Sequence, residues 1–167
     1  MNKLTDLLAQ YASYHRDHRN ILTHVVGIPM IVLSLMILLA RPTLTTVAGV
    51  PVNPGMVIAA VLALYYLKLD LRMGAVMAAV FALGLDVALQ TAPLDTGAWL
   101  AWGLGLFLVG WGIQFLGHYF EGRKPAFVDD IIGLIIGPLF VLAEVAFLLG
   151  LRKDVEAAIE QKAGSIR

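Results

Sequence analysis

The sequence contains no cysteine. Disulfides, thiolate metal sites and cysteine nucleophiles are therefore excluded. Charged residues are scarce: they make up 14% of the 167 residues, whereas an ordinary soluble domain carries about a quarter. A basic surplus is missing too, because twelve Lys and Arg balance twelve Asp and Glu. We therefore expect no nucleic-acid partner, since the net charge would not attract a polyanion.

Hydrophobic residues make up 59% of the chain, and the mean hydropathy is +0.81. This excess indicates a lipid bilayer rather than a large water-excluding core. The apolar residues fall in five segments, at 25–40, 56–67, 73–89, 98–116 and 131–151. We expect an all-α fold, a polytopic membrane helix bundle of four to five apolar segments that forms a single membrane domain over 1–167.

The two ends of the chain are more polar. Residues 1–20 carry leucines and tyrosines at three- and four-residue spacing, which predicts an amphipathic helix at the membrane interface. Residues 152–167 form a polar tail, either a charged helix or a disordered end. The last apolar segment contains Gly137-Pro138 in its middle. Because proline lacks an N–H group and clashes with the preceding turn, we expect this segment to be broken there.

The basic residues indicate the sidedness of the bundle. If the N-terminus is cytoplasmic and the first four segments each cross once, only Arg41 lies on the opposite side. The cytoplasmic side then holds Lys3, Arg16, Arg19, Lys68, Arg72, Arg123 and Lys124. This asymmetry follows the positive-inside rule. The basic residues of the tail favour the same side, so the last segment either spans or re-enters. We expect an integral protein of the inner membrane in a bacterium, or of the endoplasmic reticulum in a eukaryote.

The same parity argument applies to the four histidines. His15, His18 and His24 precede or open the first crossing, and His118 ends the fourth. An even number of crossings separates the two groups, so all four should lie at the cytoplasmic boundary. Imidazole is the commonest metal ligand in proteins. The pattern is compatible with a divalent metal site at this boundary, and also with histidines dispersed along the interface.

Spacing separates the histidines further. His18 lies between Asp17 and Arg19 and is interpreted as an ordinary interfacial residue. His15 and His24 are nine residues apart, which is about 180° around an ideal helix. They can meet at one ion only if the helix breaks between them. Asn20 is the candidate for this break, because asparagine caps helix starts.

Two carboxylates lie where they could contribute to such a site. Glu121, three residues after His118, could be a ligand, an acceptor that fixes the imidazole tautomer, or a solvated residue paired with Arg123 or Lys124. Glu144 lies within an apolar segment, where a carboxylate is costly and a partner or a function is expected.

Three motifs give the chain a family resemblance. They are Tyr14-His15-x-x-x-x-Asn20-x-x-x-His24-x-x-Gly27-x-Pro29, Gln114-Phe115-x-Gly117-His118-x-Phe120-Glu121-x-Arg123-x-Pro125-Ala126-x-x-Asp129, and Gly137-Pro138-Leu139-Phe140-Val141-x-x-Glu144. Together they resemble the iron(II)-dependent 2-hydroxy-fatty-acid dioxygenases, small multi-spanning membrane proteins of fatty acid α-oxidation. The match covers essentially the whole chain.

The resemblance implies an enzyme that binds Fe²⁺ and uses O₂ to shorten 2-hydroxy fatty acids by one carbon, cleaving between C1 and C2. By motif position it implies His15, His24 and His118 as the metal ligands. Asn20, Glu121 and Glu144 are the candidate catalytic residues. The expected partners are a 2-hydroxy fatty acid, O₂ and the bilayer, with the site on the cytoplasmic side. The alternatives are a non-catalytic membrane protein with structural or metal-storing histidines, and a zinc-dependent lipid hydrolase with Glu121 or Glu144 as its base.

Overall fold

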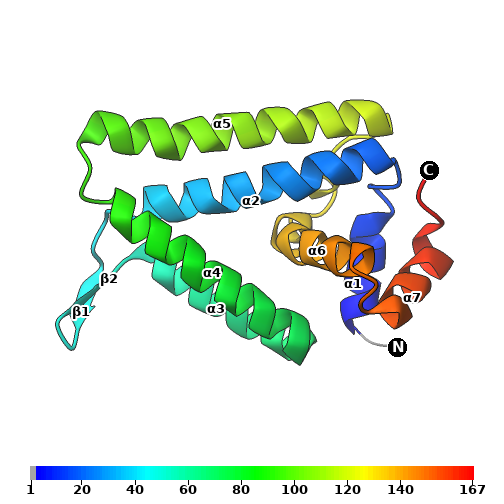
Figure 1. Ribbon diagram of the computed structural model, residues 1–167, viewed down its shortest axis with the longest axis horizontal. Helices are drawn as coiled ribbons and strands as arrows, with labels where there is room; N and C mark the ends of the chain where they lie inside the picture. The colour runs from blue at the N-terminus through cyan, green and yellow to red at the C-terminus, as the bar shows by residue number, and fades with distance from the viewer. Residues whose placement is uncertain (1–2) are drawn as a thin grey trace. The chain divides into compact units, whose positions relative to one another are not determined.

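A computed structural model describes residues 3–167. In this range the chain forms seven α-helices, one short 3₁₀ helix and one β-hairpin (Figure 1). In chain order the elements are α1 (Lys3–Ala12), α2 (His18–Ala40), β1 (Thr45–Val47), β2 (Val50–Val52), α3 (Pro54–Leu69), α4 (Leu71–Thr91), α5 (Thr96–Glu121), η1 (Ala126–Val128), α6 (Ile132–Leu148) and α7 (Lys153–Ala163).

Three of these helices, α2, α4 and α5, are long and apolar enough to cross a membrane. The pair α6 and α7 counts as a fourth span if its two helices, bent by 116°, are taken together. The remaining apolar helix, α3, has 16 residues. At 1.5 Å per residue it is about 24 Å long, shorter than a hydrocarbon core of about 30 Å. Each of the five predicted apolar segments thus contains a helix, and the last one is helical over Ile132–Leu148.

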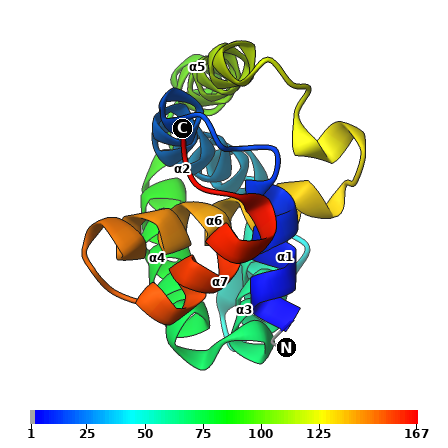
Figure 2. The same ribbon diagram turned by 90° about the vertical axis from the view of Figure 1, so that its right-hand side faces the viewer.

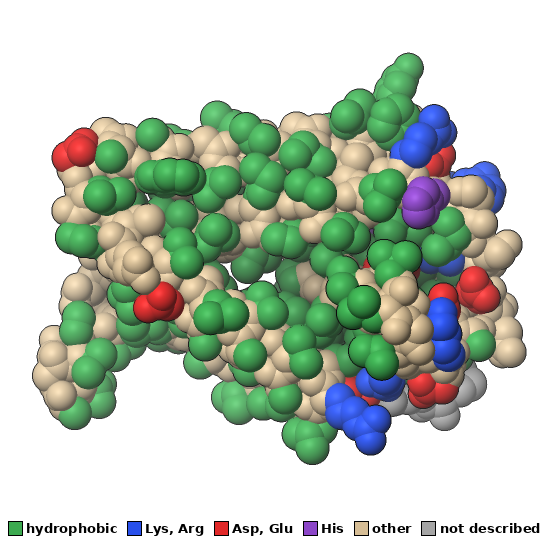
Figure 3. Space-filling view, viewed as in Figure 1, with side chains coloured by type: hydrophobic (Ala, Val, Ile, Leu, Met, Phe, Trp, Pro, Cys, Tyr) green, Lys and Arg blue, Asp and Glu red, His purple; other side chains and the backbone are tan. Residues whose placement is uncertain are grey.

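The outer surfaces of these helices are apolar, as a lipid environment requires. Val61, Leu83 and Leu108 are each at least 60% exposed, and Figure 3 shows hydrophobic side chains over most of the visible surface of α4 and α5. Water would make such a surface unfavourable, whereas lipid does not. The predicted all-α membrane bundle is confirmed.

The chain divides into two compact units, residues 30–110 and residues 1–29 with 111–167. The expectation of a single membrane domain stays a prediction. In the first unit, α3 and α4 pack side by side. Asp70 joins them: its backbone N–H donates to Tyr66 at the end of α3, and its carboxylate accepts the Met73 N–H at the start of α4. Its side chain is therefore the N-cap of α4.

Gly74 is necessary for this close packing, because a Cβ atom there would collide with the backbone of Tyr66 and Leu67. We expect Gly74→Ala to lower the stability of the protein by about 1–3 kcal/mol, the usual cost of overpacking. Thermal unfolding in detergent measures this loss. Gly105→Ala is the matched control, since a Cβ atom at Gly105 meets nothing within 4 Å. An equal unfolding temperature for the two variants would contradict the prediction.

The connection between α2 and α3 contains a β-hairpin that is not among the elements expected from the sequence. Thr45 pairs with Val52, and the turn residues Ala48 and Gly49 have φ values of 50° and 82°. Two successive positive φ angles are typical of a type I′ turn, whose twist matches that of the flanking strands. The usual Asn-Gly or Asp-Gly signal is missing at Ala48-Gly49, so the sequence does not indicate this turn.

In the second unit, the apolar face of α1 is covered by protein. Leu4 and Leu8 are fully buried, and α1 packs against α6 and α7 (Figure 2). The predicted amphipathic pattern is confirmed, but the helix is shorter than expected and ends at Ala12. The polar tail forms α7, whose Val155 and Ile159 are buried. Helices α1 and α7 therefore both belong to the packed structure.

The predicted break at Gly137-Pro138 is wrong. Helix α6 continues through Pro138, because a proline removes only one backbone hydrogen bond and surrounding contacts can compensate. Gly137 is one such contact point: a Cβ atom there would lie 3.1 Å from both the Tyr11 hydroxyl and the Ile28 side chain. The bend comes later, between α6 and α7, where Gly150 and Arg152 have positive φ angles. A left-handed glycine after the last turn is a common helix end.

Candidate metal centre

The loop between α1 and α2 separates His15 from His24. Helix α2 begins at His18, and Asp17 immediately before it accepts the Arg19 N–H at 2.9 Å, as an N-cap does. Hydrogen bonds from Arg19 lower the pKa of Asp17 to about 2. The predicted break therefore exists but lies before Asn20, which is inside the first turn of α2. Aspartate and asparagine are both good caps, and spacing could not distinguish between them.

Three of the four histidines converge. One potential ligand atom from each of His15, His24 and His118 lies within 4.8 Å of the other two. The ring centroids are 4.3, 5.1 and 5.0 Å apart. The three residues are at most 7% exposed, and all belong to the unit formed by residues 1–29 and 111–167. His18 is exposed, which agrees with its interpretation as an ordinary interfacial residue.

Main-chain carbonyl groups determine the tautomers of two of these rings. Nδ1 of His15 lies 2.7 Å from the Tyr11 carbonyl oxygen, and Nδ1 of His24 lies 2.9 Å from the Asn20 carbonyl oxygen. A carbonyl oxygen can only accept, so both Nδ1 atoms carry the proton and donate. In the neutral rings the Nε2 atoms therefore carry lone pairs. These two Nε2 atoms lie 3.0 Å apart.

Burial keeps His15 in this neutral form. Desolvation, reinforced by the neighbouring His24, lowers the pKa of His15 well below its usual value. A neutral imidazole is the form that binds a metal ion. The Nε2 atom of His15 is therefore unprotonated near neutral pH and available to a metal ion.

The donor set fits a divalent cation. Two lone pairs that face each other at 3.0 Å repel, and a cation bound by both removes the repulsion. With metal–imidazole bonds of about 2.0–2.1 Å, nitrogens at this separation subtend about 90° at an ion. His118 can add a third nitrogen, since its buried Nδ1 has no hydrogen-bond partner among the described residues. Imidazole ligands suit iron, zinc, copper and nickel alike, so the cluster could hold a metal ion, but its geometry does not select which one.

Glu121 has a role that is not among those expected from the sequence. Its Oε2 atom accepts hydrogen bonds from the backbone N–H groups of Arg16 and Asp17, at 3.0 and 2.8 Å, and from Nδ2 of Asn20, at 3.0 Å. The expected alternative of a solvated residue paired with Arg123 or Lys124 is wrong. Glu121 is buried and attaches the loop that carries His15 to the end of α5. Because about a hundred residues separate Glu121 from that loop, the sequence pattern does not indicate this contact.

Asn20 connects the same loop to His24. Its side chain donates to Glu121, while its backbone carbonyl accepts from the His24 ring. Its Oδ1 atom is buried, and no described residue offers it a hydrogen bond. Asn20 is therefore a link between two candidate ligands and the carboxylate that supports them.

Gly117 allows the side chains of Asn20 and Thr23 to pack closely against α5. A Cβ atom at this position would lie 2.5 Å from Asn20 Oδ1 and would collide with Thr23 Oγ1. We expect Gly117→Ala to displace both side chains, to lower stability by about 1–3 kcal/mol and to weaken metal binding. Titration with Co²⁺ and thermal unfolding measure the two effects. Gly112→Ala on the same helix meets nothing within 4 Å and should behave like the unaltered protein. Normal Co²⁺ affinity in Gly117→Ala would refute the argument.

Glu144 is not part of the histidine cluster. It is buried on α6. Its carboxylate interacts electrostatically with the Arg16 guanidinium. Burial lowers the pKa of Arg16, and the carboxylates of Glu144 and Glu121 oppose that change. Electrostatic attraction to the Arg16 guanidinium therefore offsets part of the cost of burying Glu144 in its apolar surroundings.

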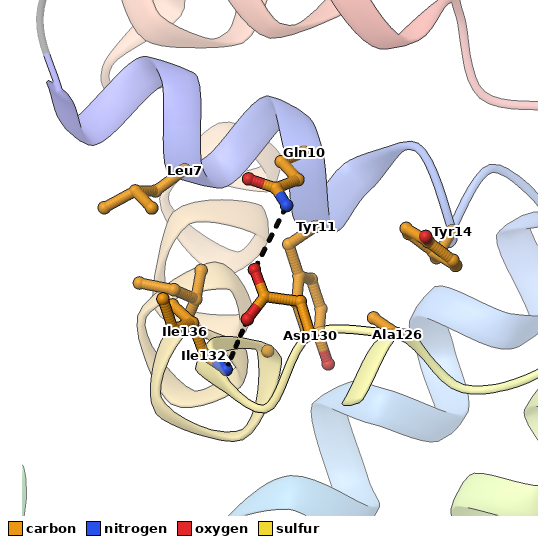
Figure 4. A pocket seen from close by; sticks show the side chains of 9 residues that line it. Leu7, Gln10, Tyr11, Tyr14, Ala126, Asp130, Ile132 and Ile136 are labelled. Carbon is orange, nitrogen blue, oxygen red and sulfur yellow. Dashed lines mark hydrogen bonds between the residues drawn. The ribbon is translucent and has the colours of Figure 1, made fainter. Parts of the chain in front are cut away.

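Two aromatic residues lie next to the histidine cluster, and both are close to the His15 ring. The Tyr11 ring stacks on His15 at 4.2 Å, with 10° between the planes, and Phe140 lies 5.7 Å from the same imidazole. Tyr11 also lines a pocket between α1 and the start of α6 (Figure 4). Asp130 crosses this pocket, accepting from Gln10 at 3.2 Å and from the Ile132 N–H at 2.9 Å. Tyr11 precedes His15 by four residues, a spacing that indicates a contact on a continuous helix, although α1 ends at Ala12 and His15 lies in the following loop.

The fold and the buried cluster define an α-helical membrane protein with a candidate three-histidine metal site. The chain belongs to the family described as 2-hydroxy-palmitic acid dioxygenase Mpo1-like, which matches residues 1–149. It is 32% identical over 162 residues to the 2-hydroxy-palmitic acid dioxygenase MPO1 of Saccharomyces cerevisiae, covering 94% of this chain and 89% of the yeast protein. No solved structure matches the chain. The family expected from the three motifs is confirmed.

Proposed function

We propose that this protein is an Fe²⁺-dependent dioxygenase that cleaves 2-hydroxy fatty acids between C1 and C2 and shortens them by one carbon. The observation that carries the proposal is the pair of imidazole Nε2 atoms facing each other at 3.0 Å beside His118, in a member of this family. The name of the yeast relative supports the substrate class.

In this proposal His15, His24 and His118 hold the metal. Tyr11 and Asn20 orient two of the rings through their carbonyl groups. When bound, Fe²⁺ supplies the activation of O₂ and the carbon–carbon cleavage. Glu121 and Asn20 act on the position of the ligands rather than on the reacting atoms, because their polar groups hold the loop of His15 and the ring of His24.

The proposed location is a membrane, with the site at its cytoplasmic boundary. The apolar surfaces of the helices support the bilayer, and the positive-inside count of the sequence supports this side. A fatty acid would place its polar head at the histidines and its acyl chain among apolar side chains. Each buried methylene is worth about 0.8 kcal/mol, so the acyl chain would supply much of the affinity.

One assay tests the proposal against its alternatives. The protein is purified in detergent with an affinity tag free of histidine, its bound metal is measured, and it is incubated with 2-hydroxypalmitate under air and under argon. We expect bound iron and a product of 15 carbons that forms only under air. Bound zinc with O₂-independent lipid hydrolysis would establish the hydrolase instead. Metal binding without turnover, after iron reconstitution, would establish a metal-storing protein.

A further inference from the structure

The chain returns to the candidate metal centre after α7. We propose that residues 164–167, here called the C-terminal strap, position the loop that carries His15. This inference rests on the proposed metal site. The strap lies beyond residues 1–149, the part that the family covers, and the three motifs do not include it.

Backbone hydrogen bonds attach the strap to the loop. The Arg167 N–H donates to the Arg16 carbonyl oxygen at 2.7 Å, and the His18 N–H donates to the Arg167 carbonyl oxygen at 3.0 Å. Arg167 thus forms backbone hydrogen bonds with the residues on either side of Asp17. This is the pattern found between neighbouring strands of a parallel sheet. Gly164 has a φ of 84°, a left-handed conformation that glycine adopts at little cost. This conformation ends α7 where the chain turns into the strap.

Side chains add two further contacts. Nη1 of Arg16 donates to the Gly164 carbonyl oxygen at 2.8 Å. Nη2 of Arg167 lies 3.3 Å from Oε1 of Glu121, whose other oxygen holds the Arg16 and Asp17 N–H groups. Glu121 therefore binds the loop with one oxygen and the strap with the other. The Arg167 side chain is 71% exposed, so this ion pair is weak and the backbone pairing carries most of the effect.

The loop depends on such contacts because it has no regular structure of its own. Residues 13–17 lie between α1 and α2, and His15 is the candidate ligand that the loop carries. A ligand held loosely binds metal poorly, and losing a group that orients a ligand typically costs 10–100-fold in metal affinity. Without the strap, the freed groups of Arg16 and His18 can bond to water. The loop then gains motion while the helices stay folded.

Truncation after Gly164 tests the strap directly. This variant keeps α7, including the N–H of Gly164 that bonds to Glu160 and the buried Val155 and Ile159. It also loses the Ile166 side chain, which is 40% exposed and therefore partly buried, so an unaltered circular dichroism spectrum is required to show that the helices stay folded. Full-length Arg167→Ala keeps the backbone pairing and removes only the ion pair. Gln161→Ala, an exposed position on α7, is the control.

The four proteins are titrated with Co²⁺ in detergent, and amide exchange is measured without metal. We expect the truncated protein to bind Co²⁺ 10–100-fold more weakly, Arg167→Ala to lose a few-fold at most, and Gln161→Ala to be unchanged. Exchange at Arg16–His18 should accelerate only on truncation, with an unaltered helical circular dichroism spectrum. Equal Co²⁺ affinity and equal amide exchange in the full and truncated chains would overturn the proposed role of the C-terminal strap. Failure of the full chain to bind Co²⁺ or Fe²⁺, together with accelerated exchange on truncation, would overturn the proposed function and leave the strap standing.

Discussion

Replacing His24 by alanine is expected to lower the affinity for Fe²⁺ by more than about 100-fold. Loss of a residue that merely orients a ligand costs 10–100-fold, and removing the ligand itself should cost more. His24 is almost fully buried and faces His15 at 3.0 Å, so water cannot supply an equivalent nitrogen in the same place. Isothermal titration under anaerobic conditions measures the loss, and chain shortening of 2-hydroxypalmitate should disappear with it.

His18→Ala is the matched control for this prediction. The residue has the same chemistry and lies six positions earlier on the same helix, but its side chain is exposed. We expect its iron affinity and activity to equal those of the unaltered protein. If His18→Ala lost iron while His24→Ala retained it, the assignment of ligands would be incorrect.

Replacing Glu121 by alanine should have the second largest effect. The change leaves the N–H groups of Arg16 and Asp17 and the Asn20 amide without their acceptor. Each buried donor left unpaired costs about 1–3 kcal/mol. We expect a lower unfolding temperature in detergent, together with at least a tenfold loss of Co²⁺ affinity, because the loop that carries His15 is released.

Glu160→Ala separates this effect from a general effect of charge. Glu160 is an exposed carboxylate that also acts electrostatically on Arg16. Its removal takes away a neighbouring negative charge without removing the acceptor that Glu121 provides. Metal affinity should therefore stay unchanged in Glu160→Ala. A loss of the same size in both variants would show that charge near Arg16, rather than the hydrogen bonds of Glu121, supports the site.

The apolar segments were predictable because their signal is local. A run of hydrophobic residues has few alternatives to a helix in lipid, and each of the five runs contains a helix. Helix ends were less predictable. Pro138 is a strong breaker by itself, yet α6 continues through it and bends only after Leu148. The competing contacts around Gly137 come from residues more than a hundred positions away.

The site divides in the same way. The meeting of His15, His24 and His118 was within reach of the sequence, since the expected parity of crossings predicts them at one boundary and the motifs name them. The role of Glu121 could not be predicted from the sequence, because its partners Arg16 and Asp17 bind it through backbone N–H groups. Every residue except proline has such a group, and no side-chain pattern distinguishes the ones that will bind a distant carboxylate.

Composition and motif order alone thus determined the membrane class, the family and the three histidines, because hydropathy and residue type are properties of each position taken singly. Which loop residue caps α2, where the last helix bends, and how Glu121 and Arg167 hold the histidine loop were decided only by the tertiary structure. These features depend on hydrogen bonds and close contacts between segments far apart in the chain, and such contacts exist only after the chain has folded.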